Sequence, residues 1–63
     1  MRLNRTKVSL LMAKMCINQM TLALSAGISR QTMSEVMNGR SCRSELLGKI
    51  SKALQVEPED IIE

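Results

Sequence analysis

The chain has 63 residues, a hydrophobic share of 44% and a formal net charge of +3, a balance typical of one small folded unit. Phenylalanine, tyrosine, tryptophan and histidine are all absent, and only two cysteines are present. This composition argues against the aromatic platforms on which single-stranded nucleic acids stack. It also argues against the Cys/His sets that hold zinc, so we expect no metal and no cofactor.

Apolar residues recur at helical spacing in the first half of the chain. A first helix is predicted after Asn4, whose side chain can cap it, with an apolar stripe of Val8, Leu11, Met12 and Met15. A second, short helix is predicted after Asn18, and Gly27 ends it. The inner stripe of this second helix comprises Leu22, Ala23 and Ala26.

Two more helices are predicted in the middle of the chain. Ser29 caps the first of them and Asn38-Gly39 ends it, with Met33, Val36 and Met37 as its inner stripe. Ser44 caps the second, and Glu45 lies in its first turn, where a negative charge is favourable. The stripe of this helix comprises Leu47, Ile50 and Leu54.

Pro58, Glu59 and Asp60 predict the start of a last helix before Ile61 and Ile62. No segment shows the alternation of a β-strand. The fold class expected is therefore all-α, a compact bundle of four to five short helices in which residues 1–63 form a single domain. Gly48 should cost its helix about 1 kcal/mol unless it lets another helix approach closely.

The second and third predicted helices are separated only by the turn Gly27-Ile28-Ser29. A turn this short makes two helices cross steeply, which requires a small residue at the crossing and a residue that tolerates positive φ in the turn. Ala23 and Gly27 meet these requirements, and Met33 and Val36 follow as anchors of the next helix. The joint pattern predicts a helix-turn-helix at about residues 19–38.

These residues resemble the Cro/repressor-type helix-turn-helix family of phage repressors and small bacterial regulators. The matching segments are INQMTLALSAGISRQTMSEVMNGR (residues 17–40) and GKISKALQVEPEDIIE (residues 48–63), and the most specific positions are Gln19, Ala23, Gly27, Met33 and Val36. The resemblance implies a five-helix bundle whose third helix recognises DNA. Cys16 and Gln55 depart from the family where glycine often ends a helix, and Met20 and Leu24 depart where polar residues are usual.

The third predicted helix presents its polar residues on the side opposite its apolar stripe. The major groove of DNA admits a helix whose leading residues touch base edges, and the resemblance places Arg30, Gln31 and Glu35 at base-reading positions. Gln31 has the amide geometry for adenine, and Arg30 suits guanine or a phosphate. Glu35 would accept from cytosine N4, or hold Arg30 or Gln31 in place. The plain alternative for each is a solvent-exposed side chain with no ligand.

A second group of residues is expected beside the sugar–phosphate backbone. The resemblance implies this role for Asn18, Gln19 and Asn38. Thr32 offers a hydroxyl to a phosphate or a methyl group to thymine. Arg40 and Arg43 follow the recognition helix and are expected to contact phosphates.

Charge is unevenly distributed along the chain. Residues 1–43 carry seven basic side chains against one acidic, whereas residues 44–63 carry two basic against five acidic. A basic front suits a polyanion. We therefore expect a transcriptional regulator of the repressor type that binds specific double-stranded DNA sequences through its third helix. The alternative is a protein-interaction module of the same fold, such as an antitoxin-like protein or a polymerase adaptor.

An enzyme is not expected, because the chain has no nucleophile–base pair, metal set or phosphate loop. No residues remain for an effector-binding domain, so no small-molecule ligand is expected either.

Some apolar residues lie outside the predicted stripes, namely Leu3, Leu10, Met20 and Leu24, and Ile61 or Ile62 would join them. Leu3 and Leu10 are expected to pack under the last helix. The alternative is that these residues join two copies in a homodimer that binds half-sites about one helical turn (~34 Å) apart.

The chain is expected to be cytoplasmic. Residues 1–7 are basic and residues 8–13 apolar, but this run is shorter than a signal peptide needs and Lys14 interrupts it. No segment is long enough to cross a membrane. Cys16 and Cys42 are expected to be two small buried hydrophobic residues, with a disulfide between them as the alternative.

Overall fold

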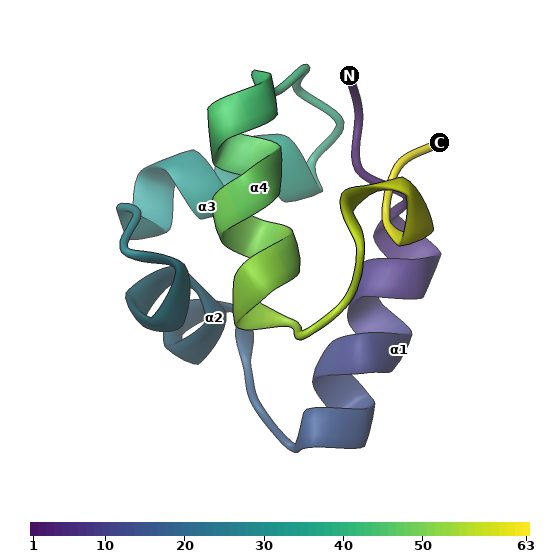
Figure 1. Cartoon of the computed structure of the whole chain (residues 1–63). Helices are drawn as coiled ribbons and strands as arrows, with labels where there is room; N and C mark the ends of the chain where they lie inside the picture. The colour runs from purple at the N-terminus through teal and green to yellow at the C-terminus, as the bar shows by residue number, and fades with distance from the viewer.

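Four α-helices and one single-turn 3-10 helix make up the secondary structure of residues 1–63 in the computed structural model (Figure 1). In chain order they are α1 (Arg5–Met15), α2 (Gln19–Ala26), α3 (Arg30–Met37), α4 (Ser44–Ala53) and η1 (Pro58–Asp60). The only β-type pairing is an isolated antiparallel bridge between Leu3 and Ile62. The expectation of an all-α bundle of four to five short helices is confirmed.

Three of the four α-helices begin at the predicted capping side chain. Asn4 Oδ1 accepts a hydrogen bond from the Lys7 amide at 3.1 Å, Asn18 Oδ1 from the Thr21 amide at 2.8 Å, and Ser29 Oγ from the Thr32 amide at 3.1 Å. These bonds satisfy amide groups that have no partner within the helix. The prediction for Ser44 is wrong.

Ser44 is already the first residue of α4, and Arg43 occupies the capping position with an extended backbone and no side-chain hydrogen bond to the helix. A side chain caps a helix only from the extended residue that precedes it, so Ser44 is one position too late. Glu45 does lie in the first turn of α4, as expected.

Left-handed residues end the helices, as expected, but they are not all glycines. Gly27 has φ 72° and Gly39 has φ 101°, whereas Asn38 has φ −88° and takes no part in the left-handed turn. Cys16 (φ 57°) and Gln55 (φ 61°) adopt the same conformation with a side chain present. A non-glycine residue pays about 1–2 kcal/mol for this conformation, so the two departures from glycine leave the helix ends in place at a local cost.

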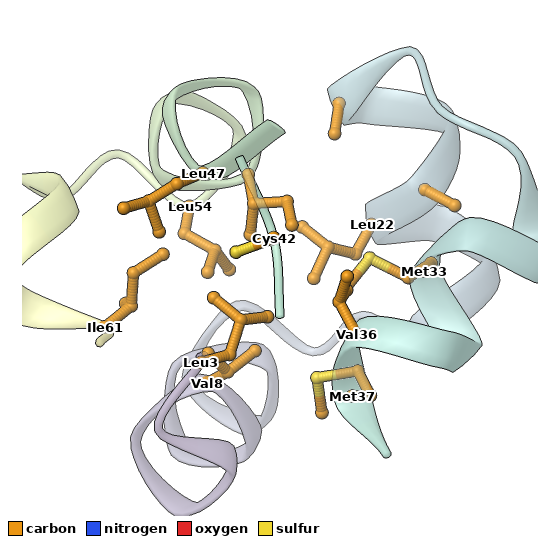
Figure 2. Packing of buried hydrophobic residues seen from close by; sticks show 13 residues of the cluster. Leu3, Val8, Leu22, Met33, Val36, Met37, Cys42, Leu47, Leu54 and Ile61 are labelled. Atoms are coloured by element: carbon orange, nitrogen blue, oxygen red, sulfur yellow. The ribbon is translucent and has the colours of Figure 1, made fainter. Parts of the chain in front are cut away.

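One hydrophobic core gathers residues from all four α-helices (Figure 2). Its 13 buried members are Leu3, Val8, Leu22, Ala23, Ala26, Met33, Val36, Met37, Cys42, Leu47, Ile50, Leu54 and Ile61. α2 packs against both α3 and α4, and η1 packs against α4. The predicted inner stripes of α2 and α3, together with Leu47, Ile50 and Leu54, are therefore confirmed.

The predicted stripe of α1 is only partly correct. Val8 is fully buried, and Leu11 and Met12 are half-buried at the edge of the core, but Met15 is 38% exposed. Met15 is the last residue of α1, beside the left-handed turn at Cys16 where the chain leaves the core. The buried part of the stripe therefore comprises Val8, Leu11 and Met12 and ends before Met15.

The two ends of the chain pair with each other. The Asn4 amide donates to the Ile61 carbonyl at 2.7 Å, and the Glu63 amide donates to the Arg2 carbonyl at 3.0 Å. This pairing buries Leu3 and Ile61, so Leu3 packs as expected, and of the two isoleucines Ile61 and Ile62 only Ile62 stays partly exposed. η1 ends at Asp60, and the bridge between Leu3 and Ile62 follows it directly. Leu10 is 64% exposed, so its predicted burial is wrong.

The two cysteines differ in their surroundings. Cys42 is buried in the core and Cys16 is exposed, and both thiols are free. The prediction of a small buried hydrophobic residue therefore holds for Cys42 and is wrong for Cys16, which lies in the turn after α1. No single helix is long and apolar enough to cross a membrane. Taken together, α1 and α2 have the length and composition of a membrane span, but the two helices are bent by 91° at the break between them.

Replacing Gly48 by alanine should stabilise the protein. A methyl group built on Gly48 meets no heavy atom within 4 Å, so no helix approaches closely enough to require glycine. Gly48→Ala should raise the free energy of unfolding by about 1 kcal/mol. The melting temperature, measured by circular dichroism, should rise by about 4–8 °C for a domain of this size.

Gly39 provides the matched control for this substitution. Its surroundings are equally open, but its φ of +101° disfavours any side chain. Gly39→Ala should therefore lower the melting temperature. A lower melting temperature for Gly48→Ala would show that Gly48 has a packing role.

Candidate nucleic-acid interface

The turn Gly27-Ile28-Ser29 sets the angle between α2 and α3. The Ile28 amide donates to the Ala23 carbonyl at 3.0 Å, which closes the end of α2, and Ser29 then caps α3. Ala23 is 1% exposed on the helix that packs against α3. The structure thus has the three features that the sequence pattern requires, which are the small residue Ala23 at the crossing, the left-handed Gly27 in the turn and the cap Ser29.

α3 divides cleanly into a buried and an exposed side. Met33, Val36 and Met37 are buried against the core. Arg30 and Gln31 are exposed, and the remaining polar residues of the helix, which are Thr32, Ser34 and Glu35, are half-buried. The helix is therefore a ridge that rests on its apolar stripe and turns its polar residues outward.

One hollow lies between α3 and the first turn of α2. Its lining residues are Gln19, Met20, Arg30, Gln31 and Ser34. The structure thus brings together three residues predicted from the sequence, namely Gln19, Arg30 and Gln31. Met20 is the only apolar residue of this hollow.

A second hollow lies on the other side of α3, against α4 and the loop before it. It brings together four of the predicted residues, which are Thr32, Glu35, Arg40 and Arg43. Two charged residues of α4 that were not predicted as site residues, Glu45 and Lys49, also line it, beside Leu46. They lie four residues apart, so the sequence places them on one face of the helix. What that face meets depends on how α4 packs.

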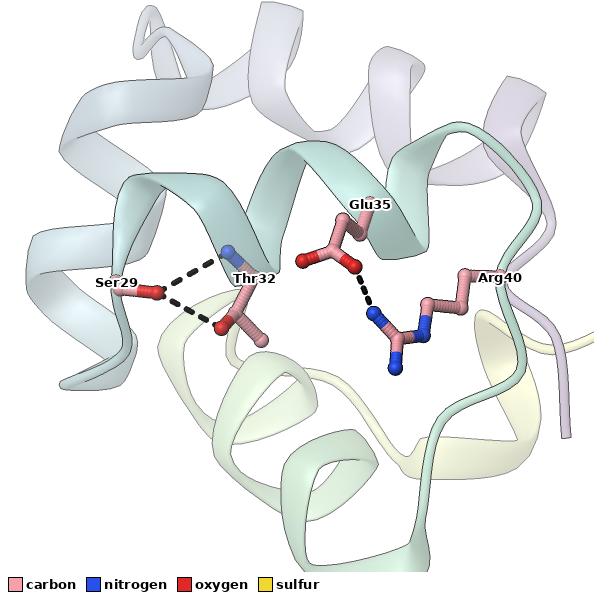
Figure 3. Close-up of polar contacts among 4 residues, drawn as sticks. All are labelled: Ser29, Thr32, Glu35 and Arg40. Atoms are coloured by element: carbon pink, nitrogen blue, oxygen red, sulfur yellow. Dashed lines mark hydrogen bonds and ion pairs between the residues drawn. The ribbon is translucent and has the colours of Figure 1, made fainter.

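Glu35 pairs with Arg40 rather than with Arg30 or Gln31 (Figure 3). Its carboxylate forms an ion pair with the Arg40 guanidinium, and the Arg40 amide donates to the Glu35 carbonyl at 3.1 Å. The left-handed turn at Gly39 brings the chain back to make both contacts. The two side chains are 35% and 69% exposed, and an exposed pair contributes only about 0–1 kcal/mol to stability. The pair therefore matters for the position of Arg40 rather than for stability.

Thr32 and Asn18 use part of their hydrogen-bonding capacity inside the protein. Ser29 Oγ donates to Thr32 Oγ1 at 2.7 Å, which leaves the Thr32 hydroxyl proton available to another acceptor (Figure 3). Asn18 Oδ1 is occupied by the Thr21 amide, which leaves the side-chain NH2 group of Asn18 with two donors. Both residues thus retain donors of the kind that phosphate oxygens accept.

Asn18 and Asn38 line neither hollow. Asn18 is exposed at the start of α2, directly before Gln19, and Asn38 is exposed at the end of α3. They therefore flank the exposed surface at its margins. The structure places seven of the nine predicted site residues around the two hollows and these two at the edges.

Basic residues outnumber acidic residues around the two hollows. Arg30 lines the first, and Arg40, Arg43 and Lys49 line the second against the carboxylates of Glu35 and Glu45. The acidic residues of the C-terminal segment, which are Glu57, Glu59, Asp60 and Glu63, line neither hollow. This segment pairs instead with the N-terminal residues, beside α1 (Figure 1). The exposed side of α3 is thus framed mainly by positive charge.

Comparison with protein families identifies the family of this chain. The model of the Cro/C1-type HTH DNA-binding domain family matches residues 7–63, which include all four α-helices except the first two residues of α1. No curated protein and no solved structure matches the chain. Because the family model covers most of the chain, the protein belongs to the Cro/C1-type helix-turn-helix DNA-binding domain family.

Proposed function

We propose that the protein is a transcriptional regulator of the repressor type, in which residues 1–63 act as one domain that binds specific sequences of duplex DNA. The observation that carries this proposal is the division of α3 into a buried apolar stripe and an exposed polar ridge between two hollows. A helix held in this way can enter the major groove, where base edges are distinguishable. Membership of the family supports DNA as the partner.

We further propose that Arg30, Gln31 and Glu35 contact base edges. Arg30 and Gln31 are exposed on the leading turn of α3. An arginine pairs with guanine and a glutamine with adenine through two hydrogen bonds each. The ion pair with Arg40 directs the carboxylate of Glu35 toward the second hollow, where its remaining lone pairs would accept from cytosine N4.

The contacts to the DNA backbone would come from residues around this surface. The residues proposed are Asn18, Gln19, Thr32, Asn38, Arg40 and Arg43, to which the structure adds Lys49 as a third cation of the second hollow. Phosphate contacts of this kind orient a protein on DNA but carry no direct sequence information. The two groups of residues should therefore differ in how their substitution affects binding.

Arg40→Ala should weaken binding to all duplexes alike. Each phosphate contact contributes about 0.9 to the slope of log K against log salt concentration, so the loss of Arg40 should flatten this slope by about one. Glu35→Gln removes the carboxylate that pairs with Arg40, and with it a negative charge. The slope of log K against log salt concentration for this variant should therefore be no flatter than the slope for the original protein. Equilibrium binding titrations over a range of salt concentrations measure both slopes. An unchanged slope in Arg40→Ala would exclude a phosphate contact at this residue.

We propose that two copies of the chain bind paired half-sites. Leu10 and Leu24, which are 64% and 76% exposed, provide apolar surface that a second copy would cover. Sedimentation should then show dimers on a DNA site with two half-sites. Only monomers at high concentration, with and without DNA, would contradict this.

We also propose a cytoplasmic location, where the two free thiols would remain reduced.

Selection of binding sites from random duplex DNA tests the proposed function directly. The full chain should enrich a short palindromic sequence. The variant with Arg30 and Gln31 both replaced by alanine should not, although it should retain the helical circular dichroism spectrum. Absence of enrichment by the original chain would overturn the proposal and favour the protein-interaction module.

A further inference from the structure

Met20 is an apolar side chain in an otherwise polar hollow. It is 46% exposed in the first turn of α2 and shares the hollow with Gln19, Arg30, Gln31 and Ser34. The core side of α2 is already supplied by three other residues, which are Leu22, Ala23 and Ala26. Met20 is therefore not needed to hold α2 in place.

The chemistry of this hollow restricts what Met20 can contact. Its thioether has no hydrogen-bond donor, so it cannot hold a phosphate oxygen. The major-groove edges of the base pairs offer hydrogen-bonding groups and one apolar group, the 5-methyl group of thymine. A methionine side chain is flexible and polarisable, so it can adapt its shape to a methyl group. The Met20 side chain, the one apolar group of the hollow, thus matches the thymine methyl group, the one apolar group of the major groove.

We propose that Met20 is a specificity-determining residue that contacts the methyl group of a thymine close to the base pair read by Gln31. The proposal rests on the proposed function, because it requires α3 to lie in the major groove. The shared hollow explains the position, since Met20 and Gln31 line the same space from two different helices. Met20 on α2 would thus favour a thymine at this position, in addition to the bases that α3 recognises by hydrogen bonds.

Uracil substitution in the DNA tests this contact. In the duplex obtained by selection, each thymine is replaced in turn by deoxyuridine, which keeps the base pair and lacks only the methyl group. One position in each half-site should lower the affinity of the original protein about fourfold, the equivalent of about 0.8 kcal/mol for one buried methyl group. Met20→Ala should bind the thymine and uracil duplexes equally at that position.

Two further variants separate this contact from a general effect. Met15→Ala truncates the same residue type at the end of α1, where it is 38% exposed and lines neither hollow, so it should keep the response to uracil. Met20→Leu keeps an apolar side chain, so it should keep part of the response. Because Met20 is not in the core, these variants should melt within a few degrees of the original protein.

The failure of this proposal is distinguishable from the failure of the proposed function. If the original protein binds the selected duplex but responds to no uracil, or if Met20→Ala responds as the original protein does, the contact with Met20 is excluded and DNA binding stands. A loss of affinity in Met20→Ala that is equal for all duplexes would indicate a contact with sugar instead. If no duplex is bound, both proposals are overturned.

Discussion

Replacing Leu22 by alanine should lower the free energy of unfolding by about 2–5 kcal/mol. Leu22 is 0% exposed, in the helix that packs against both α3 and α4, so the truncation leaves a cavity at the centre of the bundle. At about 0.05–0.15 kcal/mol per residue, the whole chain has about 3–9 kcal/mol of stability, so this loss removes a large part of it. We therefore expect a substantial unfolded fraction at 25 °C, measured by urea titration of the helical circular dichroism signal.

Leu24 provides the matched control for Leu22. It is the same residue type in the same helix two positions later, but it is 76% exposed. Leu24→Ala should change the free energy of unfolding by no more than about 0.5 kcal/mol. Equal losses in the two variants would show that α2 does not face the core as described.

Replacing Arg30 or Gln31 by alanine should each weaken binding to the selected duplex by about 1–3 kcal/mol. This corresponds to about a 5–150-fold loss of affinity, and each variant should also lose its preference at one base position. The reason is that a bidentate side chain distinguishes one base pair from the others, so its loss affects the matching sequence most. Competition titrations against duplexes changed at single positions measure both effects.

Arg5→Ala is the matched control for Arg30→Ala. Both arginines are exposed, and each is the first residue of a helix that follows a capping side chain. Arg5 lines neither hollow, so its loss should leave the sequence preference unchanged. If Arg30→Ala and Gln31→Ala also leave the preference unchanged, α3 is not the recognition helix.

Where one helix alone decides the outcome, the local signals of the sequence were reliable except for the cap predicted at Ser44. Asn4, Asn18 and Ser29 cap their helices because a capping side chain needs only the backbone that follows it. The stripes of α2 and α3 are buried because a helix with one apolar face must cover that face. The same local rules predicted the steep turn at Gly27 and the polar side of α3.

The other errors of prediction involve residues whose burial depends on contacts with other segments. The choice between Ile61 and Ile62 was open in the sequence, and Ile61 is the buried one because residues 61–63 pair with residues 2–4. Met15 and Leu10 lie on different sides of α1, and no other element covers either of them. Periodicity states which side of a helix is apolar, but not whether another segment lies against it.

The sequence by itself therefore determined the all-α class, the helix-turn-helix and the polar ridge of α3, because capping, periodicity and turn chemistry are local. Only the tertiary structure decided what surrounds that ridge. It paired Glu35 with Arg40 and brought Lys49 to the second hollow and Met20 to the first. The Glu35–Arg40 pair depends on the turn at Gly39. Met20 and Lys49 come from helices other than α3, so their positions follow from how the helices pack, and no spacing along the chain records that packing.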